Sequence, residues 1–179
     1  FRSLERKKQG IAIKNLLLWD IKRFFPEEYE VGVNALKMVQ KRVGMELSTD
    51  EAGFIALHLV NAEMEEEVGN IYELTKLMQE ITNIVKYYFK VSFDEDSVYF
   101  YRFSTHLKFF CYRLLHQREV VENDDEELYA VIKKKYLNAY RCVEKISLYL
   151  NENYDYQVSN EERLYLTIHI ARIVQTTEQ

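Results

Sequence analysis

The chain has 179 residues, of which 47% are hydrophobic and 30% are charged, and its formal net charge at pH 7 is −5. This composition is typical of a folded globular protein, and the negative charge argues against a nucleic-acid-binding surface. The longest apolar runs, such as 53–60, are shorter than the roughly 18 to 20 residues that span a bilayer. Because no signal sequence is visible either, we expect a cytoplasmic protein without membrane insertion.

Helices are predicted along the whole chain, because 5 glycines and 1 proline supply few of the turns that strands need. The first predicted helix covers 16–24 and stops at Pro26, since a proline disfavours helical geometry in the residue before it. The next helix is predicted at 27–43, and it ends near Gly44.

Two serines mark the starts of further helices. In a capping box, the serine oxygen accepts a hydrogen bond from the amide three residues later, and a glutamate at that position reaches back to the serine amide. Ser48 with Glu51 fits this pattern, and so does Ser159 with Glu162. Between them, helices are predicted at 71–88, 97–117 and 128–151, with an acidic loop at 123–127. The sequence therefore predicts an all-α protein.

The sequence matches itself when it is shifted so that His169 lies on His58 (169 − 58 = 111), and no gap is needed. This repeat shift also brings Ser159 onto Ser48. Self-similarity at a fixed period indicates copies of one structural unit. We therefore predict two homologous helical-bundle domains in tandem. Their expected boundaries are 1–66 for the first domain, 67–70 for a linker and 71–179 for the second domain.

Three of the four histidines, His58, His106 and His169, share one helical setting. Each has apolar residues at −3, +1 and +4, which form one stripe of a helix with the histidine at its margin. These neighbours are Ile55, Leu59 and Ala62; Phe103, Leu107 and Phe110; and Leu166, Ile170 and Ile173. We therefore expect each of the three imidazoles to lie near a packed face. His116 has no such setting and is predicted at the surface.

A histidine beside an apolar stripe is often an ordinary core residue, but three recurrences of one setting favour a shared role. Metal binding is disfavoured, because none of the three has another His, Cys, Asp or Glu within four residues. The sequence also shows no nucleophile motif, no Gly-rich phosphate loop and no dinucleotide fingerprint, so we predict neither an enzyme nor a bound cofactor. A neutral imidazole is a nucleophile towards phosphoryl donors, and the three histidines are therefore candidate phosphorylation sites.

The histidines lie in three motifs, which read DEAGFIALHLVNA at 50–62, YRFSTHLKFF at 101–110 and LYLTIHI at 164–170. Together with LLWDIKRFFP at 17–26, these motifs resemble the paired phosphotransferase-system regulation domains of bacterial sugar-operon antiterminators of the β-glucoside and sucrose type. The resemblance covers essentially the whole chain. It implies two helical-bundle domains with phosphorylatable histidines, placed behind an N-terminal RNA-binding domain that we expect to lie outside this chain.

The resemblance also implies opposite effects of phosphorylation in the two domains. His58 would be an inhibitory site, phosphorylated in a reaction that depends on the sugar-specific enzyme II when inducer is absent. His106 and His169 would be activating sites, phosphorylated by the phosphocarrier HPr when preferred sugars are scarce. A first-domain counterpart of His106 would lie before Phe1, so we expect the first domain to be incomplete at its N-terminus.

Polar residues beside the histidines are candidate phosphate or interface neighbours: Asn61, Arg102, Thr105, Lys108 and Arg172. We expect the unphosphorylated second-domain histidines to lie near the seam of a homodimer, where added phosphate would reorganise the packing. Two other functions stay open. The chain could be a module of a related transcriptional activator, which carries similar domains behind DNA-binding segments, or a helical scaffold that acts without phosphorylation.

Overall fold

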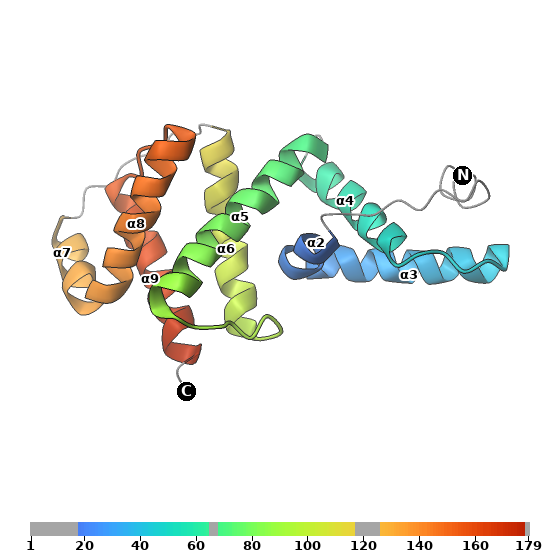
Figure 1. Ribbon diagram of the computed structural model, residues 1–179, viewed down its shortest axis with the longest axis horizontal. Helices are drawn as coiled ribbons and strands as arrows, with labels where there is room; N and C mark the ends of the chain where they lie inside the picture. The colour runs from blue at the N-terminus through green and yellow to red at the C-terminus, as the bar shows by residue number, and fades with distance from the viewer. Residues whose placement is uncertain (1–17, 65–67, 117–125, 178–179) are drawn as a thin grey trace. The chain divides into compact units, whose positions relative to one another are not determined.

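The computed structural model describes residues 18–64, 68–116 and 126–177, and over these residues it contains eight helices and no strand (Figure 1). The all-α prediction is therefore confirmed. None of the helices described has the length and the hydropathy that crossing a bilayer requires. The helices are α2 (Leu18–Phe24), α3 (Pro26–Val43), α4 (Asp50–Met64), α5 (Val68–Phe89), α6 (Val98–Leu115), α7 (Glu126–Lys135), α8 (Leu137–Tyr154) and α9 (Asn160–Thr177).

The chain divides into two compact units, 1–75 and 76–179. In the first unit, α4 packs against α2 and α3; in the second unit, α9 packs against α6, α7 and α8. Helix α5 begins at Val68, so residues 68–70 of the predicted linker are helical, while residue 67 lies outside the described residues.

The predicted single helix over 128–151 is wrong, because the chain breaks between α7 and α8 at Tyr136. Tyr136 has φ −121° and ψ 48°, and Phe25, its counterpart by the repeat shift, has nearly the same φ of −131° and ψ of 59°. Phe25 precedes Pro26, whereas Tyr136 precedes Leu137. The break therefore belongs to the fold of both copies and does not depend on a proline.

The helices α3 and α8 also end in the same way. Gly44 after α3 has φ 67°, and its counterpart Asp155 after α8 has φ 51°. In both cases the amide of this left-handed residue donates to a carbonyl of the last helical turn. Glycine adopts this conformation at no steric cost, and aspartate is one of the few other residues that tolerate it. The repeat in the sequence is thus a repeat of backbone geometry.

The capping box predicted for α9 is confirmed. The amide of Glu162 donates to Ser159 Oγ at 3.2 Å, and the amide of Ser159 donates to Glu162 Oε2 at 3.1 Å. The Glu162 side chain is only 2% exposed, and its other oxygen accepts a hydrogen bond from the Tyr156 hydroxyl at 2.8 Å. In the first copy the serine half of the box differs from the prediction, because Ser48 Oγ accepts from the amide of Asp50 at 3.2 Å and the amide of Glu51 donates to the Ser48 carbonyl.

The two copies pack their last two helices by different means. In the first unit, α3 approaches α4 so closely that a Cβ atom on Gly32 would lie 2.3 Å from the carbonyl oxygen of Ala52. Only glycine fits at this contact. By the repeat shift, Val143 corresponds to Gly32 and Arg163 corresponds to Ala52. Because both of these residues carry larger side chains, the second unit cannot reproduce this close approach.

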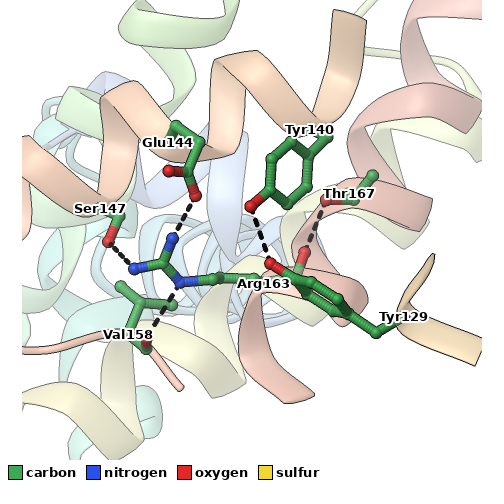
Figure 2. A network of polar contacts seen from close by, with 7 residues as sticks. All are labelled: Tyr129, Tyr140, Glu144, Ser147, Val158, Arg163 and Thr167. Carbon is green, nitrogen blue, oxygen red and sulfur yellow. Dashed lines mark hydrogen bonds and ion pairs between the residues drawn. The ribbon is translucent and has the colours of Figure 1, made fainter. Parts of the chain in front are cut away.

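In the second unit, Arg163 joins α9 to α8 through a polar network (Figure 2). Its guanidinium donates to the Glu144 carboxylate and, at 3.1 Å, to Ser147 Oγ. Nearby, the hydroxyls of Tyr129 and Tyr140 lie 2.7 Å apart and connect α7 to α8. The Arg163 contacts hold the N-terminal half of α9, the helix that carries His169, against α8.

Candidate functional site

Helices α6 and α9 bring His106 and His169 together. Their ring centroids are 3.8 Å apart with an interplanar angle of 27°, so the two imidazoles are stacked. Both imidazoles are half-buried. The apolar neighbours that the sequence placed around them are all buried, namely Phe103, Leu107, Phe110, Leu166, Ile170 and Ile173. The prediction that these imidazoles lie near a packed face is therefore confirmed for this pair.

Tyr165 lies beside both rings. Its hydroxyl oxygen is 2.5 Å from Nδ1 of His106, and its ring is edge-on to His106 and to His169, with centroid distances of 5.4 and 4.6 Å. Burial raises the pKa of the Tyr165 hydroxyl above its usual value. Tyr165 was not predicted as a site residue, although it precedes His169 by four residues and so shares its helix face.

The stacked pair lines a pocket of about 290 Å³. Arg102 from α6 and Arg172 from α9 line the same pocket, and both are exposed. Guanidinium groups are permanently charged and donate planar pairs of hydrogen bonds, which suits phosphate and carboxylate. In the part of the chain that the structure describes, no cluster of three or more His, Cys, Asp or Glu side chains is placed to hold a metal ion. The pocket therefore has the chemistry of an anion site.

Burial and neighbouring positive charge keep both imidazoles neutral. Burial, His106 and Arg172 together lower the pKa of His169 to about 4. Burial and the Arg172 guanidinium also lower the pKa of His106. Each of these neighbours disfavours a further positive charge in the pocket. At neutral pH both rings therefore carry a nitrogen lone pair that can act as a nucleophile.

We expect the second unit to lose stability as the pH falls from about 6.5 to about 4. In this pH window His169 is protonated in the unfolded chain but not in the folded chain. The free energy of unfolding therefore increases with rising pH and decreases with falling pH. After a discount for solvent screening of a half-buried group, the loss is about 2 kcal/mol. Urea unfolding across this pH range measures it.

The variant His169→Asn removes this titration and should flatten that part of the stability profile. His116→Asn, which removes a histidine outside the pocket, is the matched control. If the free energy of unfolding of His169→Asn depended on pH as steeply as that of the unsubstituted chain, the loss of stability in acid could not be assigned to His169.

His58 in the first unit lies differently. It is exposed, its neighbours Ile55 and Leu59 are only half-buried, and Ala62 is exposed. The expectation that this imidazole lies near a packed face is therefore wrong. In the second unit α9 packs against α6, and any residues of this chain that the repeat shift aligns with α6 lie outside the described residues.

Two of the other predicted neighbours do not line the pocket. Thr105 Oγ1 donates to the carbonyl of Tyr101 at 2.8 Å, and the Lys108 ammonium lies 5.9 Å from the ring centroid of Phe109. Beside His58, the amide oxygen of Asn61 is buried and has no hydrogen-bond partner within the described ranges. The structure thus brings the two arginines to the histidine pair, but not the threonine or the lysine.

His116 is half-buried, although a surface position was predicted. Its ring stacks on Tyr112 with centroids 4.1 Å apart, and its Nδ1 lies 2.7 Å from the Tyr112 carbonyl oxygen. This contact holds the His116 ring against its own helix turn, and His116 does not line the pocket.

The comparison with known families decides what kind of domain carries this pair. A family model described as PRD domain matches residues 2–62 and 79–173, that is, one match in each copy of the repeat. The chain belongs to the PRD domain family. The tandem arrangement predicted from the repeat is thereby confirmed.

Curated relatives of this tandem PRD chain are antiterminators. Transcription antiterminator LicT of Bacillus subtilis (strain 168) is 49% identical over 172 residues, which are 96% of this chain and 62% of LicT. The Beta-glucoside operon antiterminator of Dickeya chrysanthemi is 45% identical over 171 residues, which are 96% of this chain and 60% of that protein. The PtsGHI operon antiterminator of Bacillus subtilis (strain 168) is 26% identical over 171 residues, with the same two shares of 96% and 60%. The chain thus spans about three fifths of the length of these relatives.

The two PRD copies differ in the residues around their motif histidines. By the repeat shift, Tyr165 corresponds to Phe54 and Arg172 corresponds to Asn61. The hydroxyl and the guanidinium that surround the stacked pair are therefore features of the second PRD.

Proposed function

We propose that this chain is the regulatory module of a sugar-operon transcriptional antiterminator, controlled by phosphotransferase-system-dependent phosphorylation of its histidines. The observation that carries the proposal is the stacked, neutral pair of His106 and His169 in a pocket that Arg102 and Arg172 also line. The antiterminator names of the relatives support the process in which the module acts.

The pocket has the parts that histidine phosphorylation needs. A neutral ring nitrogen of His106 or His169 attacks the phosphorus of a phosphohistidine on the donor protein, and the N–P bond of the donor breaks. The new phosphoryl group adds about two negative charges and several hydrogen-bond acceptors. Arg102 and Arg172 can neutralise this charge through charge-assisted hydrogen bonds.

The partners are those that the resemblance to phosphotransferase-system regulation domains implies. We assign the phosphocarrier HPr as donor to His106 and His169, and an enzyme II-dependent reaction to His58, whose exposed ring is open to a protein donor. The proposed assembly is a homodimer with the second-PRD pair near its seam. RNA binding would belong to a domain outside this chain, and the whole system would act in the cytoplasm.

Phosphosite mapping tests the proposal. The chain is incubated with phosphoenolpyruvate, enzyme I and HPr, kept alkaline to preserve phosphohistidine, and compared with His58→Ala, His106→Ala, His169→Ala and the control His116→Ala. We expect label on His106 or His169 and none on His116, because only the former two lie in the arginine-lined pocket. Absence of label from folded protein, with HPr itself labelled in the same reaction, would overturn the proposal and favour a scaffold without phosphorylation.

A further inference from the structure

The contact between Tyr165 and His106 is specific to one ring and one nitrogen. The Tyr165 hydroxyl oxygen lies 2.5 Å from Nδ1 of His106. Among the residues that the structure describes, no protein hydrogen-bond partner is placed on either ring nitrogen of His169. In the first PRD, Phe54 stands at the position of Tyr165 and has no hydroxyl.

The hydrogen bond leaves two arrangements of the His106 proton. A neutral imidazole carries a proton on one nitrogen and a lone pair on the other. If the Tyr165 hydroxyl donates to Nδ1, the proton of the ring is on Nε2; if Nδ1–H donates to the hydroxyl oxygen, the lone pair is on Nε2. The environment of Nε2 therefore decides between the two tautomers.

The arginines of the pocket favour the second arrangement. His106 lines the pocket, whereas Tyr165, whose hydroxyl contacts Nδ1, does not, and we therefore take Nε2 as the ring nitrogen on the pocket side. Arg102 and Arg172 line that pocket, and guanidinium groups only donate hydrogen bonds. A lone pair facing these cations is stabilised, whereas an N–H group facing them is not.

We propose that Tyr165 is a positioning residue, whose hydroxyl oxygen accepts the Nδ1–H of His106 and leaves Nε2 as the nitrogen that takes the phosphoryl group. This inference rests on the proposed phosphorylation of His106. In the step, the bond from Nε2 to phosphorus forms, the N–P bond of the donor phosphohistidine breaks, and its electron pair returns to the donor nitrogen. The proton stays on Nδ1, where the positive charge that develops on the ring strengthens the hydrogen bond to Tyr165.

The first test needs no phosphoryl donor. Nitrogen-15 NMR of the imidazoles reports which ring nitrogen of His106 carries the proton, and Tyr165→Phe is the matched variant because it keeps the ring and gives the residue of the first PRD. We expect the Nδ1–H tautomer in the unsubstituted chain and its loss in Tyr165→Phe. An Nε2–H tautomer in the unsubstituted chain, or no change in the variant, would overturn the inference.

The second test uses the phosphorylated chain. The label on His106 should be the Nε2 isomer of phosphohistidine, and Tyr165→Phe should slow the labelling of His106 about two- to tenfold, the range expected for loss of one hydrogen bond. The labelling rate of His169 serves as internal control, since phenylalanine preserves the ring contact with it. Label on Nδ1 of His106 would overturn this inference alone, whereas absence of label from every histidine would overturn the proposed function as well.

Discussion

Replacing both His106 and His169 with aspartate is expected to tighten the self-association of the chain roughly tenfold or more, which corresponds to about 1.4 kcal/mol. The proposed seam would bring Arg102 and Arg172 of two protomers close to one another, where their like charges repel. A carboxylate at each histidine position neutralises a guanidinium, and each charge-assisted hydrogen bond contributes about 1.5 to 3 kcal/mol. In a symmetric dimer every such contact occurs twice.

Sedimentation equilibrium at several concentrations measures the dissociation constant. Adding Arg102→Gln and Arg172→Gln to the double aspartate variant should cancel the gain, because the carboxylates then have no cation to neutralise. His116→Asp, which puts the same charge outside the pocket, is the control. A dissociation constant that is the same in the double aspartate variant and in the unsubstituted chain would contradict the placement of the pair at a dimer seam.

Replacing Glu162 with alanine is expected to lower the free energy of unfolding of the second PRD by about 3 kcal/mol. Its buried carboxylate accepts hydrogen bonds from the Tyr156 hydroxyl and the Ser159 amide at the start of α9. Without it, two donors lose their partner in a region with little water, and the helix loses one half of its capping box.

Glu161 is the matched control for this prediction, since it is the adjacent glutamate of α9 and is exposed. Thermal or urea unfolding should show Glu161→Ala within about 0.5 kcal/mol of the unsubstituted chain. Glu162→Gln, which keeps one acceptor oxygen, should fall between the two alanine variants. Equal stabilities of Glu161→Ala and Glu162→Ala would refute the role given to the buried carboxylate.

Local chemistry made much of the fold predictable. Ser159 and Glu162 predict the start of α9, because a capping box requires these two side chains at this spacing. Gly44 predicts the end of α3, because glycine tolerates the left-handed conformation. The break at Tyr136 escaped prediction because no proline marks it. Its geometry comes from the packing of the domain, and the matching break at Phe25 in the repeat was the available signal.

The site was predictable residue by residue but not as an assembly. The apolar stripe around His106 and His169 shows that each ring lies beside a core, yet the stacking of the two rings depends on how α6 packs on α9. Helical periodicity within one segment carries no information about that packing. The exposure of His58 escaped prediction for the same reason, because the same stripe can meet different neighbours in the two copies.

The close approach at Gly32 limits how parts of the two copies can be exchanged in chimeric proteins. A chimera that carries α8 in place of α3 would press Val143 against the backbone of α4 at Ala52, where even a single Cβ atom does not fit. The reverse exchange would give α9 a partner without Glu144 and Ser147, which hold Arg163. In this chain the last two helices of each domain are therefore an indivisible module, and recombination between the copies can succeed only where it moves both together.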